Sequence, residues 1–128
     1  MGETLRVGIV EDNAVFREAL VLLLGGKPGV EVAGAVGSGE EAVTLCRKTR
    51  LDVVLLDYRL PGMNGVETTR AIRAATPGTA VVGLTASATV REIEALKEAG
   101  ALACLTKDAR LDDIVAEIRI AAAAPVTR

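Results

Sequence analysis

Apolar runs and helical patterns alternate along this chain, and that alternation limits the folds open to it more than any other feature. The first, third and fourth apolar runs are nearly continuous, as in parallel strands covered on both faces. The pattern predicts one α/β domain of βα units joined by right-handed crossovers. The strands are expected at Arg6–Val10, Val30–Val36, Val53–Leu56, Ala80–Leu84 and Ala101–Leu105, and the helices at Ala14–Leu24, Gly39–Thr49, Gly65–Ala75, Thr89–Ala99 and Arg110–Ala122.

The order of the strands in the sheet follows from the fold class. We expect a flavodoxin-like (βα)5 three-layer sandwich, with a parallel five-stranded sheet in the order 2-1-3-4-5. Its ligand crevice lies outside the carboxyl ends of the first and third strands, which are the strands that Asp12 and Asp57 follow. The domain is expected over residues 1–124, with 125–128 as a tail or the start of a linker, because Pro125 cannot continue a helix interior.

Several helix ends carry recognisable signals. A capping box at a helix N-terminus needs an acceptor and a Glu three residues later, and a C-terminal cap favours a glycine in the left-handed conformation. These signals occur at Ser38 with Glu41 and Asn64 with Glu67 for the capping boxes, and at Gly25 and Gly100 for the C-terminal caps.

Composition excludes several classes of function. The 128 residues carry a net charge of −2 and include no His and no Trp, so His-based catalysis, His metal ligands and a base-stacking nucleic-acid surface are not expected. Cys46 and Cys104 have no motif spacing and are interpreted as reduced, buried thiols. No membrane span or signal pattern is visible, so we expect a cytoplasmic protein.

Polar residues gather where the predicted strands end. Glu11 and Asp12 follow the first strand and Asp57 follows the third, so the carboxylates are expected to face one another across about one strand spacing of 4.8 Å. Clustered carboxylates either raise a pKa or bind a cation. Oxygen ligands without Cys or His suit Mg²⁺, with Mn²⁺ as the alternative.

Thr85 and Lys107 follow the fourth and fifth strands and are expected at the same edge of the sheet. A hydroxyl and an ammonium beside an acidic metal site fit the arrival of a phosphoryl group, whose oxygens they would contact. The chemistry that follows is attack of the Asp57 carboxylate on phosphorus, which gives an acyl phosphate. Each residue alone is usually a solvated strand end, so the conjunction carries the prediction.

This set of residues resembles the receiver domain of two-component response regulators over essentially the whole chain. The segments that carry the resemblance are Val7–Asn13, Val53–Asp57, Leu60–Gly65, Gly83–Ala86 and Leu105–Lys107. The resemblance implies that Asp57 is the phosphoacceptor and that Thr85 and Lys107 contact the phosphoryl oxygens. It implies a Mg²⁺ held by Asp12, Asp57 and the Arg59 carbonyl, with Glu11 helping through water, and a phosphohistidine of a sensor histidine kinase as the donor.

One position departs from the family pattern. Receivers usually carry Tyr or Phe three residues before the lysine, as part of a switch with the threonine, and here that position is Cys104. Phosphorylation at Asp57 is still expected, whereas coupling from Thr85 to an output through a ring at position 104 is not. The candidate moving segment is the loop Thr85–Thr89, which is built from small residues.

Two enzyme-like readings are disfavoured by particular residues. Gly37–Ala42 fits a dinucleotide fingerprint, but Glu40 and Glu41 would put negative charge where a pyrophosphate must sit. A haloacid-dehalogenase-like phosphatase needs an acidic residue two places after its nucleophile, and here that residue is Arg59. We therefore expect a phosphoacceptor with self-catalysed phosphotransfer and autodephosphorylation at most.

The output stays open between alternatives. Similarity to receivers of the NarL/FixJ type favours control of a DNA-binding domain outside this chain, with no nucleic acid bound by this domain itself and no membrane partner. A stand-alone receiver and a degenerate, non-phosphorylated interaction module are the alternatives. A homodimer is a further alternative, through the first and last helices or through the face of the last two helices and the last strand.

Overall fold

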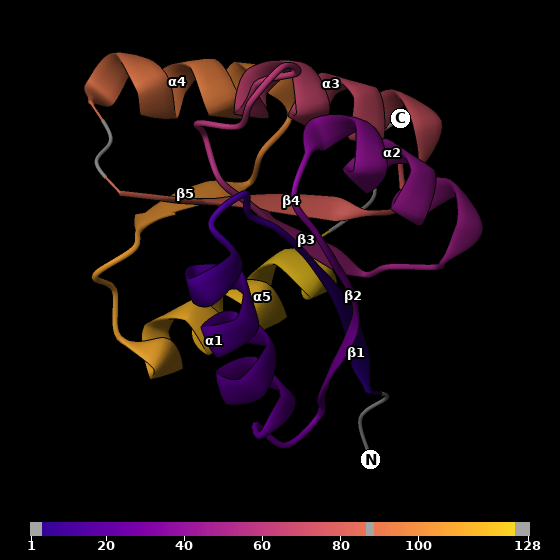
Figure 1. Cartoon of the computed structure of the whole chain (residues 1–128), viewed down its shortest axis with the longest axis vertical. Helices are drawn as coiled ribbons and strands as arrows, with labels where there is room; N and C mark the ends of the chain where they lie inside the picture. The colour runs from indigo at the N-terminus through magenta and orange to yellow at the C-terminus, as the bar shows by residue number, and fades with distance from the viewer. Residues whose placement is uncertain (1–3, 87–88, 125–128) are drawn as a thin grey trace.

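The computed structural model describes residues 4–86 and 89–124 and confirms the alternation of strands and helices (Figure 1). Pro125 and the expected tail lie outside the described residues. Within residues 4–86 and 89–124, no helix has the length and apolar character to cross a membrane. In chain order the elements are β1 Leu5–Val10, α1 Ala14–Gly25, β2 Val30–Val36, α2 Gly39–Lys48, β3 Val53–Leu56, α3 Gly65–Ala75, β4 Ala80–Thr85, α4 Val90–Ala99, β5 Ala103–Thr106 and α5 Leu111–Ala123.

The five strands form one parallel sheet in the order β2-β1-β3-β4-β5, as predicted. Figure 1 shows α1 and α5 on one face of the sheet and α2, α3 and α4 on the other, which makes three layers. Central β3 is buried along its whole length, because helices cover both of its faces. The carboxyl ends of β1 and β3 lie side by side, with Val10 opposite Leu56.

Each face of the sheet has its own apolar core, and alternate residues of β3 supply both. Val53 and Leu55 pack with the residues of α1 and α5, while Val54 and Leu56 pack with those of α2, α3 and α4. A strand that is apolar at four consecutive positions therefore satisfies two cores at once. The first polar residue after it, Asp57, emerges at the edge of the sheet.

The helix caps agree with the sequence signals at most positions. Asn64 and Glu67 form the reciprocal capping box of α3. Ser38 caps α2, but the Glu41 carboxylate accepts hydrogen bonds from the Gly37 N–H and the Ser38 hydroxyl, so the second half of that box is shifted by one residue. The Gly37 and Glu41 N–H groups, which a bound pyrophosphate would need, therefore already have partners within the turn. This supports a capped turn rather than a dinucleotide site.

The prediction for Gly25 was wrong. Gly25 is the last residue of α1, and the C-cap falls on Gly26 with φ −85°, because the helix continues one residue further than its apolar pattern. Gly100 does end α4 with φ +120°, a conformation that favours glycine.

Candidate functional site

Three carboxylates meet at the carboxyl ends of β1 and β3. The Glu11, Asp12 and Asp57 side chains each offer an oxygen, and these oxygens lie within 4.8 Å of one another. The Asp57 N–H donates to the Val10 carbonyl at 3.1 Å, so the pairing of the two strands continues into the site. Glu11 and Asp57 are buried, with 2% and 6% of their surface exposed, whereas Asp12 is exposed. The predicted acidic cluster is therefore present, and it opens to solvent at Asp12.

Lys107 bridges the two buried carboxylates. Its Nζ lies 2.6 Å from Glu11 Oε1 and 3.1 Å from Asp57 Oδ2. Its backbone N–H donates to the Thr85 carbonyl at 2.7 Å, which fixes the start of the side chain at the end of β4. Sequence reasoning placed Lys107 at this edge, but its direct contact with Glu11 was not expected.

Burial and ion pairing set the protonation of these groups. Burial raises the pKa of Glu11, and the hydrogen bond from Lys107 offsets only part of that rise. Burial opposes the charge on Lys107, but its hydrogen bonds to Glu11 and Asp57 together outweigh burial and raise the pKa of Lys107. Lys107 is therefore a firmly charged ammonium, and it partly neutralises a concentrated negative charge.

The loop after Asp57 is held against the site by short backbone contacts. The Arg59 N–H donates to Asp57 Oδ1 at 3.2 Å, and the Gly65 N–H donates to the Tyr58 carbonyl at 2.9 Å. A Cβ on Gly65 would lie 2.7 Å from both the Asp57 carbonyl oxygen and the Tyr58 Cα, so only glycine permits this approach of α3. The Arg59 guanidinium lies 5.8 Å from the centre of the Tyr58 ring.

Thr85 and Cys104 lie on the next two strands of the sheet, β4 and β5. Thr85 ends β4 and is 1% exposed, and its strand pairs with β5 on the far side from β3. Cys104 is half-buried on β5 opposite Gly83, and burial raises the pKa of its thiol. Ser87 and Ala88, in the segment expected to move, lie outside the described residues.

The donor set of the acidic cluster fits a small divalent cation. Glu11, Asp12 and Asp57 supply carboxylate oxygens only, which are the ligands that Mg²⁺ and Mn²⁺ prefer. The buried Glu11 with its raised pKa also fits, because a bound cation would take over the neutralisation that Lys107 now provides.

The structure adds contacts that sequence reasoning missed. The Asn13 N–H donates to Glu11 Oε2 at 2.9 Å, and the Arg17 guanidinium donates to the Glu11 carbonyl at 2.7 Å. The Phe16 ring centre lies 4.7 Å from the Lys107 Nζ. Asn13 was recognisable as a helix N-cap before Ala14, but nothing in the sequence indicated that Phe16 would meet Lys107.

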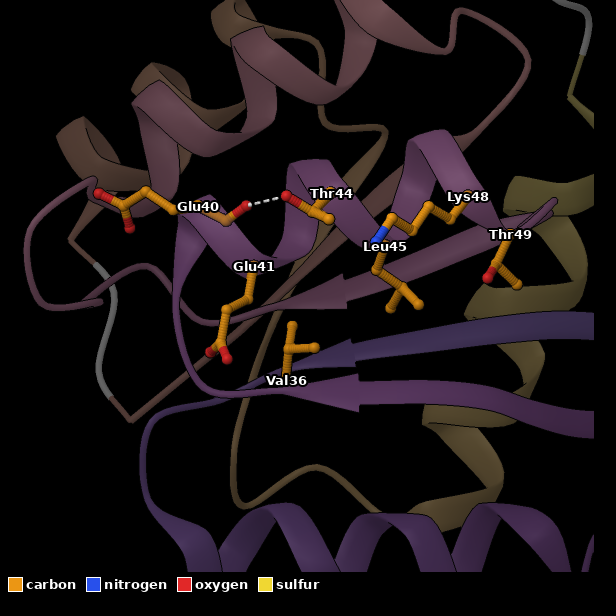
Figure 2. Close-up of a pocket in the computed structure, with 7 residues that line it drawn as sticks. All are labelled: Val36, Glu40, Glu41, Thr44, Leu45, Lys48 and Thr49. Carbon is orange, nitrogen blue, oxygen red and sulfur yellow. Dashed lines mark hydrogen bonds between the residues drawn. The ribbon is translucent and has the colours of Figure 1, made fainter.

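A second concave feature lies between α2 and the end of β2 (Figure 2). This open pocket has a volume of about 430 Å³, and none of its lining residues belongs to the acidic cluster. Figure 2 shows the Thr44 hydroxyl donating to the Glu40 carbonyl along α2 at 3.2 Å. The lining residues are Val36, Glu40, Glu41, Thr44, Leu45, Lys48 and Thr49.

The fold and the acidic edge together are typical of a receiver domain, and comparison with known proteins agrees. The sequence model of the response regulator receiver domain matches residues 7–119. The chain therefore belongs to the response regulator receiver family. It is 34% identical over 116 residues to response regulator GacA of Pseudomonas viridiflava, a match that covers 91% of this chain and 54% of GacA. The chain thus spans about half the length of this curated relative.

Solved structures give the same answer. The signal receiver domain of a response regulator called NarL from Mycobacterium tuberculosis superposes with a TM-score of 0.91 at 31% identity, covering 97% of this chain and all of that chain. The receiver domain of sensor histidine kinase PA1611 from Pseudomonas aeruginosa gives a TM-score of 0.82 at 29% identity, covering 94% and 98% of the two chains. That structure holds a magnesium ion in its active-site cleft.

Proposed function

We propose that Asp57 accepts a phosphoryl group from a phosphohistidine of a sensor histidine kinase, in a reaction that needs Mg²⁺. One observation carries the proposal: the buried Asp57 carboxylate belongs to a cluster of three carboxylates and also lies 3.1 Å from the Lys107 ammonium, at the carboxyl end of the central strand. The carboxylates suit a cation and the ammonium suits an anion, so both halves of a phosphoryl-transfer site flank one nucleophile.

The reaction forms one bond and breaks one bond. A carboxylate oxygen of Asp57 attacks phosphorus, the bond from phosphorus to the donor imidazole nitrogen breaks, and its electron pair returns to that nitrogen. The product is an acyl phosphate on Asp57, and nothing is oxidised or reduced. Lys107 Nζ, already 3.1 Å from Asp57 Oδ2, and the Thr85 hydroxyl contact the phosphoryl oxygens.

The metal ligands in this proposal are the side chains of Asp12 and Asp57 and the carbonyl of Arg59, with Glu11 acting through water. The supporting observations are the proximity of the three carboxylates and the hydrogen bond that brings the Arg59 backbone to Asp57. When bound, Mg²⁺ neutralises charge on the phosphoryl oxygens and the carboxylates. Glu11 and Asp12 would orient the cation beside Asp57.

We also propose a signalling role rather than turnover of a substrate. The phosphorylated domain regulates transcription through a DNA-binding output outside these residues, in the cytoplasm where kinase and DNA are both accessible. The similarity to full-length response regulators about twice the length of the aligned region supports this proposal. A stand-alone receiver is the alternative, and it predicts the same chemistry at Asp57.

Intact-protein mass spectrometry tests the chemistry. Wild type and Asp57→Ala are incubated with acetyl phosphate, with and without Mg²⁺, and a phosphoramidate donor is tried in parallel. The expected result is one added phosphoryl group that requires both Mg²⁺ and Asp57. An adduct that forms equally on Asp57→Ala moves the acceptor elsewhere. No adduct under any condition leaves a degenerate interaction module.

A further inference from the structure

The Lys107 ammonium touches an aromatic ring as well as two carboxylates. Its Nζ lies 4.7 Å from the centre of the Phe16 ring, 2.6 Å from Glu11 Oε1 and 3.1 Å from Asp57 Oδ2. We infer that Phe16 is a positioning residue for phosphoryl transfer, whose ring holds the Lys107 ammonium facing Asp57. This inference rests on the proposed function, since it concerns the cation that receives the phosphoryl oxygens.

The ring is fixed to the acidic site by a closed set of contacts. Glu11 Oε2 accepts the Asn13 N–H at 2.9 Å, and Asn13 Oδ1 in turn accepts the Phe16 N–H at 2.9 Å as the N-cap of α1. Phe16 then meets Lys107, and Lys107 returns to Glu11. The start of α1 therefore cannot shift without moving the carboxylate, the ring and the ammonium relative to one another.

The position of the Lys107 ammonium depends on its side chain, because the backbone of Lys107 is fixed. The Lys107 N–H is bound to the Thr85 carbonyl at 2.7 Å, which anchors its main chain to β4. Phe16 is itself half-buried and packs against the apolar core beneath α1 and α5, and this packing restricts the movement of its ring. The Lys107 side chain runs from its fixed backbone to the Phe16 ring. Few of its conformations keep the ammonium in contact with both the ring and the carboxylates.

The ring matters most when the carboxylates are otherwise engaged. A cation held by Asp12 and Asp57, with Glu11 acting through water, would share the charge of these carboxylates and so weaken their attraction for Lys107 when the phosphoryl group arrives. The attraction between an ammonium and an aromatic face does not depend on those carboxylates. Phe16 therefore retains Lys107 at the mouth of the site while Lys107 exchanges Glu11 for a phosphoryl oxygen.

Binding of beryllium fluoride, an anion that mimics a phosphoryl group, tests this role in the whole chain. Its dissociation constant is measured by ¹⁹F NMR at saturating Mg²⁺ for wild type, Phe16→Leu and Phe16→Tyr. Phe16→Leu keeps an apolar side chain but loses the aromatic face, and it should weaken binding roughly three- to tenfold. Phe16→Tyr should restore most of the affinity. Mg²⁺ affinity alone, measured by calorimetry, should change less than about twofold in either variant, since the contact of the ring at this site is with the Lys107 ammonium, which is not a metal ligand.

A double-mutant cycle separates positioning from packing. In a Lys107→Met background, Phe16→Leu should have no further effect on fluoride binding, because the ring has no cation to hold. Val15→Ala, at a neighbouring position of α1 that is 79% exposed, controls for disturbance of the helix start. Phe16→Met replaces Phe16→Leu in the cycle if the leucine variant does not fold.

The failures are distinguishable. If wild type binds beryllium fluoride and is phosphorylated on Asp57, but Phe16→Leu binds equally well, the positioning role is wrong and the proposed function stands. The same loss of affinity with and without Lys107 also overturns the positioning role. If wild type neither binds the fluoride nor forms the adduct, the proposed function fails first and this inference fails with it.

Discussion

Arg59 Nη2 lies 2.8 Å from Glu92 Oε2, so the residue two places after the proposed phosphoacceptor is tied to the first turn of α4. The other oxygen of Glu92 accepts the Thr89 N–H at 3.0 Å, and the Glu92 N–H donates to the Thr89 hydroxyl at 3.1 Å. One carboxylate thus serves both the capping box of α4 and the loop that follows β3. Movement of the loop after β3 should therefore affect the start of α4, and movement of α4 should affect that loop.

Substitution of Glu92 separates these two tasks. Glu92→Gln keeps the return bond of the capping box and weakens only the ion pair, and since Arg59 is largely exposed, the loss should stay below about 1 kcal/mol. Glu92→Ala removes both contacts and should lose about 1–2 kcal/mol. Urea unfolding measures both values. Equal losses for the two variants would show that the cap contributes nothing.

Gly65→Ala should destabilise the domain by about 1–3 kcal/mol, because the new Cβ meets backbone atoms that cannot rotate away. It should also slow phosphorylation, since those atoms belong to Asp57 and Tyr58. Gly78→Ala is the matched control, because a Cβ there has no neighbour within 4 Å. Free energies of unfolding that are the same for both variants would contradict the close approach of α3.

Lys107→Met should destabilise the domain in a pH-dependent manner. The pKa of Glu11 already lies above its usual 4.5 in the folded state, and loss of Lys107 raises it further. When the pKa of a carboxyl group is higher in the folded protein than in the unfolded chain, the free energy of unfolding falls as the pH rises from the unfolded pKa through the folded pKa. The loss relative to wild type should therefore be larger at pH 7 than at pH 5, and about 1–3 kcal/mol at pH 7.

Urea unfolding at pH 5, 6, 7 and 8 checks this dependence. Lys27→Met is the matched control, because Lys27 pairs with the exposed Asp112, whose pKa is lowered by that contact. Its effect on the free energy of unfolding should be small and flat from pH 5 to 8, because the contact lowers the pKa of Asp112 and the carboxylate stays charged throughout this range. A flat profile for Lys107→Met as well would mean that Glu11 does not depend on the lysine.

Cys104→Tyr should leave phosphorylation of Asp57 intact and alter self-association that depends on phosphorylation. The thiol faces Gly83 across the β4–β5 pair and is too small to switch between buried and exposed positions as a ring does. Sedimentation velocity with and without a phosphoryl donor measures association, and Cys104→Ala controls for loss of the thiol. Unchanged association in Cys104→Tyr would count against a coupling role at this position.

Local periodicity predicted much of the fold. Val53–Leu56 is apolar at every position because both faces of β3 are covered, and that pattern alone indicated a central parallel strand. Once the strand order was inferred, the ends of the strands brought Asp12, Asp57 and Lys107 together. The contacts of Phe16 with Lys107 and of Arg59 with Glu92 were not predictable, because each joins a helix to a segment far away in the sequence, which no local pattern records. The prediction of a C-terminal cap at Gly25 was wrong by one residue, because two successive glycines follow the apolar stripe of α1 and the sequence does not distinguish them.

The contact of Arg59 with Tyr58 makes the domain its own optical reporter. The chain has one Tyr and no Trp, so all ultraviolet emission from a phenol ring arises directly beside the proposed phosphoacceptor. A guanidinium already lies over that ring, and any charge placed on Asp57 changes the field that both groups experience. Tyrosine fluorescence of the unlabelled protein should therefore respond to the metal binding and phosphoryl transfer that we propose.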